Sequence, residues 1–209
     1  MTKGMLSIVI PVYNGADGLR ILMEQFRPQV NKHVEIVVVD DGSTEDMTWV
    51  KEYPNVVYVR KENGGCATAR NAGLKKAKGE YITLVDADDE VPPDYVSIVL
   101  ENMGAGYDWV SYDWICDDGK GMVTQTDDPL MINLATWGYS FRKDFIGDTR
   151  FNEKMNCADD TDWLRRVLRD GCKHKHDHRI IYNYQWERNP NSLSHRCVRG
   201  ELKVWKDEK

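Results

Sequence analysis

Hydrophobic and polar positions in the first half of the chain follow two alternating patterns. Short, continuous apolar runs rich in β-branched residues predict buried strands, and the segments between them carry apolar residues at helical spacing. The predicted strands are 5–13, 33–43, 55–65 and 80–89, and the predicted helices are 15–29, 43–53 and 66–79. Because continuous apolar strands that alternate with helices are typical of parallel sheets covered on both faces, the sequence predicts an α/β fold.

The second half of the chain is less regular. An aromatic strand, a glycine turn and a return strand are expected over 106–128, and a further aromatic strand is expected over 136–146. A helix is predicted over 157–171, because acids fill its first turn and arginines follow, as the helix dipole favours. No internal repeat or clear linker interrupts the chain, so we expect one domain over 1–209.

Composition and charge argue against several classes of function. The net charge of −6 and the pI of about 5.4 argue against nucleic-acid binding, which usually needs a basic patch. The five cysteines form no C-x-x-C pair and are odd in number, which argues against a disulfide framework or a zinc site and favours a reducing compartment. No apolar run approaches the roughly 20 residues needed to span a bilayer, and the first apolar run reads as a strand rather than a signal peptide. We therefore expect a soluble, cytoplasmic protein.

A cluster of acids directly follows the predicted strand over 80–89, at Asp86, Asp88, Asp89 and Glu90. Clustered carboxylates raise one another's pKa unless a cation neutralises them. An oxygen-rich pair at i and i+2, such as Asp86 and Asp88, suits Mg²⁺ or Mn²⁺, with substrate phosphates completing the shell. The alternative is an acidic turn that only caps the following helix.

Polar residues end two other predicted strands as well, at Tyr13–Asn14 and at Asp40–Asp41. The carboxyl ends of parallel strands meet at one edge of the sheet, and ligands bind in the crevice outside that edge. We therefore expect one crevice to hold both pairs together with Asp86 and Asp88.

Four segments, in their order and spacing, resemble the nucleotide-binding half of the family 2 glycosyltransferases. The segments are "SIVIPVYNG", "EIVVVDDGSTED", "ENGGCATARNAGL" and "GEYITLVDADD". Further along, "CADDTDWLRRVL" is similar to the acceptor-side acidic motif of that family, with Asp159 where Glu is more usual, and "YNYQWERNPNSLSH" is similar to a segment that often follows it. The resemblance covers roughly residues 5–195.

This resemblance implies a GT-A (Rossmann-like) fold with a mostly parallel central sheet, helices on both faces and a smaller mixed half. Residues of about 5–105 would bind a nucleotide-sugar, about 106–195 would form the acceptor side, and 196–209 would be a charged tail. The implied donor-binding residues are Pro11, Tyr13, Asn14, Asp40, Asp41, Arg70, Asp86, Ala87 and Asp88. The implied metal ligands are Asp86 and Asp88, with His195 as a late ligand or diphosphate contact, and the implied ion is Mn²⁺ or Mg²⁺.

Each implied donor contact also has a physical reason. The Tyr13 ring would stack near the base, and Asp41 would accept a hydrogen bond from a base N–H. Arg70 would approach the diphosphate, helped by free backbone N–H groups near Gly64 and Gly65 at a helix start. The alternatives are a helix-capping turn for the aspartates and a surface arginine on an alanine-rich helix for Arg70.

Inverting sugar transfer needs a base for the acceptor hydroxyl, and the candidates are Asp159, Asp160 and Asp162. The apolar stripe of their helix comprises Trp163, Leu164, Val167 and Leu168. At about 100° per residue, Asp160 falls near the centre of this stripe, Asp159 lies roughly 110° away and Asp162 is nearly opposite. Helix geometry and the family motif therefore both indicate Asp160 as the base, with Asp159 as helix cap or acceptor contact.

Two further patterns are weaker. Trp137 is a candidate for stacking on an acceptor sugar, and core packing is the equal alternative. His174, His176 and His178 alternate, so on a strand they would share one face. We expect that face to be simply polar, although it would mimic a metal site.

The sequence thus predicts an inverting glycosyltransferase that moves a sugar from a nucleoside diphosphate donor to an acceptor hydroxyl. We expect a UDP-sugar as the donor and a role in cell-surface glycan or polysaccharide synthesis. The acceptor is expected to be a glycan, a lipid-linked molecule or a protein. Peripheral membrane association and the oligomeric state are left open. The rivals are a non-catalytic nucleotide or sugar binding module, which would not need Asp160, and a sugar-phosphate nucleotidyltransferase, which would carry a glycine-rich, basic loop after its first strand.

Overall fold

Seven strands form one sheet in the computed structural model, which describes every residue except 118–134, 170, 189, 191 and 207–209. The strands are β1 (Thr2–Val12), β2 (Val34–Asp40), β3 (Val56–Arg60), β4 (Gly79–Leu84), β5 (Trp109–Cys116), β6 (Tyr139–Arg142) and β7 (His174–Tyr184). The α-helices are α1 (Ala16–Phe26), α2 (Cys66–Lys76), α3 (Tyr95–Gly104), α4 (Lys143–Ile146), α5 (Asp159–Val167) and α6 (Leu193–Val198), and the 3-10 helices are η1 (Thr48–Glu52) and η2 (Thr136–Gly138).

The strand order is β3-β2-β1-β4-β6-β5-β7. The first four strands in this order, β3, β2, β1 and β4, pair in parallel, and so do β5 and β7. The strand β6 runs antiparallel to both β4 and β5. The sheet is therefore mostly parallel, with its mixed part in the second half of the chain. This is the predicted α/β architecture, and it brings the carboxyl ends of β1, β2 and β4 to one edge.

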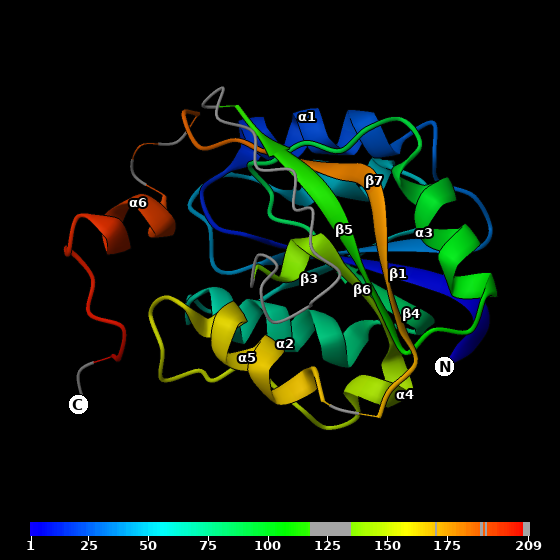
Figure 1. The fold of residues 1–209 in the computed structure, drawn as a ribbon. Helices are drawn as coiled ribbons and strands as arrows, with labels where there is room; N and C mark the ends of the chain where they lie inside the picture. The colour runs from blue at the N-terminus through cyan, green and yellow to red at the C-terminus, as the bar shows by residue number, and fades with distance from the viewer. Residues whose placement is uncertain (118–134, 170, 189, 191, 207–209) are drawn as a thin grey trace.

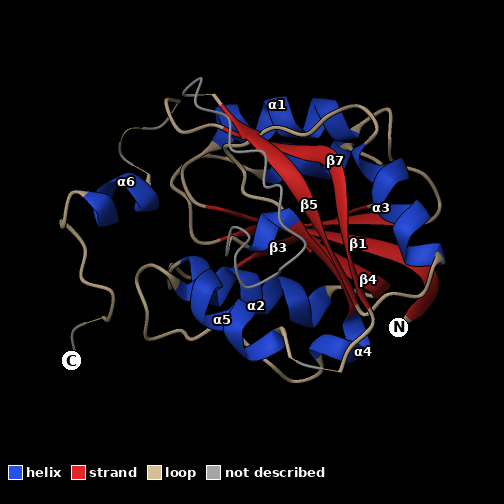
Figure 2. Ribbon diagram, in the orientation of Figure 1, coloured by secondary structure: helices blue, strands red, loops and turns tan. Residues whose placement is uncertain are grey.

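Helices cover both faces of the sheet, as Figures 1 and 2 show. One hydrophobic cluster joins α1 and α3 to alternate residues of β1 and β2, such as Ile8 and Ile36. A second cluster joins α2, α4 and α5 to the opposite face, through residues such as Val9 and Val37. Because neighbouring residues of a strand point to opposite faces, a strand buried on both sides must be mostly apolar. Residues 6–12 of β1 are apolar except at Ser7, and β2 is apolar except at Glu35 and Asp40.

The helix α2 packs unusually close to the sheet. A Cβ atom at Gly73 would lie 2.3 Å from Cγ1 of Val9, a distance that real atoms do not reach. Glycine at this position therefore lets the backbone of α2 rest on β1. Since Arg70 lies one turn earlier on α2, this contact fixes the depth at which its side chain enters the site.

Several predicted elements were wrong in detail. The helix expected over 43–53 is only the 3-10 helix η1, which follows a turn in which Asp46 accepts hydrogen bonds from the backbone N–H and the hydroxyl of Thr48. The strand expected over 136–146 is split into η2, β6 and α4. The return strand expected within 106–128 falls mostly outside the described residues.

The expectation about cysteines also needs correction. Cys157 and Cys197, which lie 40 residues apart in sequence, are joined in a disulfide that ties α6 to the segment before α5. An odd count without a C-x-x-C motif is therefore compatible with one long-range pair, and the cysteine pattern no longer argues for a reducing compartment. In the part of the chain that the structure describes, no helix is both long and apolar enough to cross a bilayer.

Candidate active site

The loop after β1 is tied to the loop after β2. The backbone N–H of Asn14 donates to Oγ of Ser43 at 3.0 Å, and Oδ1 of Asn14 accepts from the backbone N–H of Thr44 at 2.8 Å. Asn14 adopts a positive φ of 49°, which asparagine tolerates better than most residues. Pro11 is buried beside it, whereas 54% of Tyr13 is exposed, so its ring is available to a ligand at this edge.

Asp40 ends β2 as a fully buried carboxylate. It accepts hydrogen bonds from the Tyr58 hydroxyl at 2.7 Å, from the backbone N–H of Ser43 at 2.8 Å and from the Arg60 guanidinium at 2.6 Å. Burial alone would raise the pKa of Asp40, but the hydrogen bonds from Tyr58 and Ser43 and the charge of Arg60 lower it overall. Asp40 therefore holds the loop as an anion.

Asp41 faces the start of α2. Its carboxylate accepts from Lys61 Nζ at 2.5 Å and from the backbone N–H groups of Gly64 and Gly65 at 3.1 Å and 2.7 Å. The sequence predicted that these two N–H groups would be free to meet a diphosphate, and in this structure Asp41 occupies them. Lys61, which the sequence reasoning missed, adds a cation that also contacts Oγ1 of Thr68.

Arg70 connects the donor side of the site to the acceptor side. Its Nη2 lies 3.0 Å from Oδ1 of Asp86, and its Nη1 lies 2.9 Å from Oδ2 of Asp159, which is 89 residues further along the chain. The arginine side chain is only 5% exposed, so the alternative of a surface arginine does not hold. Among the described residues its buried Nε has no hydrogen-bond partner, which leaves one donor of the guanidinium unused.

A tyrosine of β7 binds the turn Asp86–Ala87–Asp88 through hydrogen bonds. The Tyr182 hydroxyl accepts from the backbone N–H of Asp86 at 3.0 Å and donates to Oδ2 of Asp89 at 2.8 Å. Asp89 is buried, and its pKa is raised well above the usual range. Burial is the larger cause, and the nearby charges of Asp86 and Asp88 add to it. The turn also touches α1, where a Cβ at Gly18 would lie 2.9 Å from the backbone oxygen of Ala87.

The three acids of α5 occupy three different environments. Asp159 is 6% exposed and paired with Arg70, whereas the side chain of Asp162 is 32% exposed and pairs with Arg166 on the next turn. Asp160 is half-buried, and in the described structure its carboxylate accepts a hydrogen bond from the backbone N–H of Thr161. Burial raises the pKa of Asp160 to about 6. The positive charge of Arg70 lowers this pKa, and the negative charges of Asp159 and Asp86 raise it.

The burial order of these acids differs from the helical-wheel expectation, which placed Asp160 deeper than Asp159. The helix α5 begins at Asp159, after Ala158 in a left-handed conformation with φ of 57°. The direction of the first helical side chain is therefore set by this turn and by Arg70, which draws Asp159 inward. Asp160 is left beside the buried pair with a carboxylate that Arg70 does not bind.

The three implied metal ligands do not gather into one close group among the described residues. In the described ranges, one group of three or more His, Cys, Asp or Glu residues has its ligand atoms within 4.8 Å of one another, and it is Asp113, His176 and His178. Asp86, Asp88 and His195 thus do not converge to that distance here. His195 lies on α6, bonded to Oγ of Ser192 at 3.0 Å and stacked on Trp186, so its metal role stays a prediction.

The acids themselves fit a divalent cation. Asp86 and Asp88 are two half-buried carboxylates, and their charge adds to the high pKa of the neighbouring Asp89. Carboxylate oxygens are the ligands that Mg²⁺ and Mn²⁺ prefer, and a cation would relieve this repulsion.

Trp137 lies in the core beneath this site. It is 5% exposed and stacks on Tyr182 with ring centroids 4.4 Å apart, and Trp114 meets it edge-on at 5.0 Å. An acceptor sugar would reach the Trp137 face only if these rings moved apart, so its contact with an acceptor stays a prediction. The ring instead supports Tyr182, which sequence reasoning missed because it lies 96 residues from Asp86.

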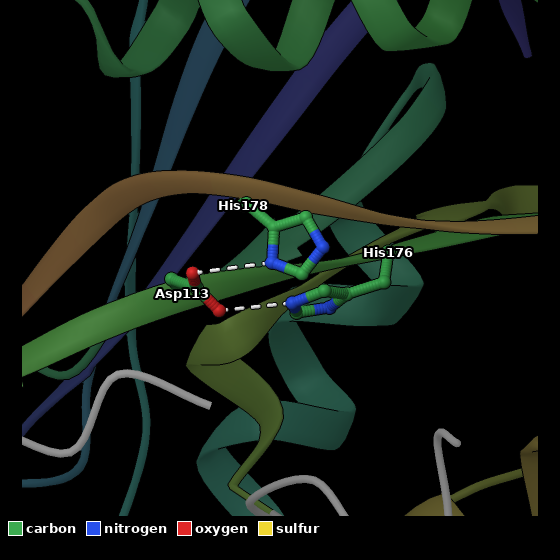
Figure 3. Close-up of side chains that lie close together, drawn as sticks. All are labelled: Asp113, His176 and His178. Atoms are coloured by element: carbon green, nitrogen blue, oxygen red, sulfur yellow. Dashed lines mark hydrogen bonds and ion pairs between the residues drawn. The ribbon is translucent and has the colours of Figure 1, made fainter. Parts of the chain in front are cut away.

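The alternating histidines have an unexpected partner. His176 is buried between Ser111 and Asp113 of β5, with its Nδ1 at 2.8 Å from Oγ of Ser111 and its Nε2 at 2.9 Å from Oδ1 of Asp113. His178, whose side chain is 60% exposed, reaches the other oxygen of the same carboxylate, as Figure 3 shows. The predicted polar face of this strand is thus an organised cluster.

Comparison with known proteins supports the family resemblance. The family described as Glycosyl transferase family 2 matches residues 7–172. The uncharacterized glycosyltransferase YibD of Escherichia coli is 40% identical over 93 residues, which are 42% of this chain and 27% of that protein. The glycosyltransferase GlyA of Streptococcus pneumoniae is 37% identical over 103 residues, 47% of this chain and 15% of that protein.

Solved structures show the same fold. The structure of S. aureus TarS 1-349 in complex with UDP-GlcNAc superposes with a TM-score of 0.81 at 21% identity, over 91% of this chain and 60% of that one. The mannosyltransferase PcManGT from Pyrobaculum calidifontis, in complex with GDP-Man and Mn²⁺, superposes with a TM-score of 0.65 at 19% identity, over 85% of this chain and 56% of that one. This chain is therefore shorter than all four proteins. The predicted GT-A fold is confirmed, and the match over residues 7–172 shows that the chain belongs to glycosyl transferase family 2.

Proposed function

We propose that the protein transfers a sugar from a nucleoside diphosphate donor to an acceptor hydroxyl, with inversion at the sugar carbon. The observation that carries this proposal is the double ion pair of Arg70 with Asp86 and Asp159. It joins the acidic turn at the edge of the parallel sheet to the helix that carries Asp160. The proposed binding site of the departing diphosphate and the proposed acceptor base are thereby linked through one arginine.

Asp160 has the properties of the base. Its pKa of about 6 keeps it ionised at neutral pH and makes it a stronger proton acceptor than an exposed aspartate. Its carboxylate is not engaged by Arg70, which binds its neighbour Asp159 instead. Asp160 would take the proton of the acceptor hydroxyl as that oxygen attacks the sugar carbon, and the bond from the sugar to the diphosphate would break on the opposite side.

The donor side would hold the nucleotide between the loops after β1 and β2. The exposed Tyr13 ring would pack on the base, and Asp41 would exchange one of its present partners for a base N–H. The buried guanidinium of Arg70, with its unused Nε donor, would stabilise charge on the departing diphosphate. Asp86 and Asp88 would hold Mn²⁺ or Mg²⁺, which when bound neutralises diphosphate charge.

The choice of donor rests on the relatives. The TarS structures were determined with UDP and with UDP-GlcNAc, so a UDP-sugar is the first donor to test here. The mannosyltransferase neighbour was determined with GDP-Man, which makes GDP the matched comparison. We infer a glycan, lipid-linked or protein acceptor of the cell surface, reached from the cytoplasmic side.

A thermal-shift screen tests the donor site. UDP, GDP, CDP and dTDP are each added with Mn²⁺, Mg²⁺ or EDTA to the wild type and to Asp88→Asn. We expect one nucleotide to raise the melting temperature in a metal-dependent way, because a ligand that binds only the folded state stabilises it by mass action. The shift should vanish in Asp88→Asn and persist in Asp94→Asn, an exposed acid beyond the turn. If no nucleotide shifts the wild type, the proposed donor site is wrong.

A further inference from the structure

The cluster of Asp113, His176 and His178 lies outside the donor site and has no part in the proposed transfer. Asp113 belongs to β5, and the two histidines belong to β7, so the cluster joins two strands that pair in parallel at the edge of the sheet. In Figure 3 both imidazole rings turn toward the Asp113 carboxylate. One ligand atom from each of the three residues lies within 4.8 Å of the other two.

A local irregularity of β7 brings His178 to this position. Tyr112 pairs with Asp177, but the next residue of β5, Asp113, pairs with Ile180. His178 and Arg179 are therefore extra residues of β7, in a bulge between the partners of Tyr112 and Asp113. Bulges of this kind re-aim a side chain and are common next to functional sites. Here the bulge leaves Nδ1 of His178 at 3.5 Å from Oδ2 of Asp113, beside the His176 ring.

The surroundings of His176 suit it to bind a metal through Nε2. In the tautomer with its proton on Nδ1, the ring donates to Oγ of Ser111 and its Nε2 lone pair faces the Asp113 carboxylate, whereas in the other tautomer the Ser111 hydroxyl donates and Nε2–H points to Asp113. Metal-binding histidines usually donate their second N–H to an oxygen, as in the first tautomer, which fixes the ring and its tautomer.

The same contacts resemble a Ser–His–Asp arrangement, but Ser111 is fully buried in the sheet. Its hydroxyl cannot meet a substrate, and it orients the imidazole instead. The route for a ligand is at the other end of the cluster, where the side chain of His178 is 60% exposed while those of His176 and Asp113 are each 2% exposed. A cation from solvent would therefore meet His178 first and the buried pair next.

We propose that Asp113, His176 and His178 form a second divalent-cation site, selective for Zn²⁺ over Mg²⁺. Two imidazole nitrogens and one carboxylate oxygen suit Zn²⁺, whereas Mg²⁺ prefers oxygen ligands alone. Three protein ligands leave a fourth position of a tetrahedral ion open to water or to an oxygen of a ligand. The site does not depend on the proposed transferase function, because neither Asp88 nor Asp160 takes part in it.

The test is a metal titration of the EDTA-stripped protein. Zn²⁺ binding is followed by competition with a chromogenic chelator, and Co²⁺ is used as a spectroscopic probe of nitrogen ligation. We expect the wild type to bind one equivalent of Zn²⁺ with Mg²⁺ in excess, and His178→Ala to lose at least about tenfold in affinity. His178 is exposed, so the variant should fold, which a melting curve checks.

Two matched variants separate this site from its alternatives. His174→Ala removes an exposed imidazole of the same strand outside the cluster, and it should bind Zn²⁺ as the wild type does. Asp88→Asn should also bind Zn²⁺ unchanged. The proposal is overturned if the stripped wild type takes up no Zn²⁺, if His178→Ala binds as tightly as the wild type, or if Asp88→Asn abolishes binding.

Discussion

Replacing Arg70 by methionine probes the contact on which the site is built. Methionine fills a similar volume without the charge, so Asp86 and Asp159 lose their shared cation. Removing one partner of a buried ion pair costs about 3–5 kcal/mol, because it leaves an uncompensated charge. The side chain of Asp159 is 9% exposed but that of Asp86 is 27% exposed and can regain water, so we expect the lower end of this range.

A loss of about 3 kcal/mol in a domain of this size lowers the melting temperature by about 6–12 °C. Urea unfolding at pH 7, followed by circular dichroism, gives the free energy of unfolding directly. The matched control is Arg166→Met, which breaks the half-exposed pair of Arg166 with Asp162 on α5 and should cost less than about 1 kcal/mol.

A double variant checks the physical reason. Asp159→Asn removes the buried charge that Arg70→Met leaves without a counter-charge. The double variant should therefore be more stable than Arg70→Met alone. The reasoning is refuted if Arg70→Met unfolds at the wild-type urea concentration, or if the added Asp159→Asn destabilises it further.

Three other predictions follow from single contacts. The transfer rate should fall as pH drops through about 6, because Asp160 must be ionised to accept a proton, and a pH–rate profile with a flat acid limb would contradict this. Gly73→Ala should cost about 1–3 kcal/mol in urea unfolding, since its Cβ would overlap Val9; an unchanged midpoint would show that α2 can move away. Tyr182→Phe should cost about 1–3 kcal/mol, because Asp89 loses a donor, and it should weaken nucleotide binding in the thermal-shift assay; wild-type values for both would remove Tyr182 from the support of the turn.

The first half of the fold was predictable because its strands are buried on both faces. Every residue of β2 is buried and all but Glu35 and Asp40 are apolar, and such a run leaves a clear pattern between amphipathic helices. The order of strands then places Asn14, Asp41 and Asp86 at one edge, as expected. The second half has short elements, such as β6 with four residues, whose limits depend on neighbours rather than on local sequence.

The contacts that complete the site were not predictable from one sequence. Tyr182 supports the turn after β4 from a distance of 96 residues, and Cys157 meets Cys197 only because α6 folds back. His174, His176 and His178 were recognised as alternating on one strand, but Asp113, the partner of the last two, lies on another strand. Periodicity reports which face a residue occupies, and it carries no information on which distant side chain shares that face.

Nucleotide release from sugar donors in the absence of an acceptor tests the proposed role of Asp160 most directly. The wild type, Asp160→Asn and the matched Asp162→Asn are incubated with UDP-GlcNAc, UDP-glucose and GDP-mannose in Mn²⁺, and the released nucleoside diphosphate is measured. We predict slow release from one donor class by the wild type and by Asp162→Asn, and a fall of about 10²–10⁴-fold in Asp160→Asn with donor binding retained. Release by Asp160→Asn at the wild-type rate would contradict its role as the base, and donor binding without any release by the wild type would favour a binding module.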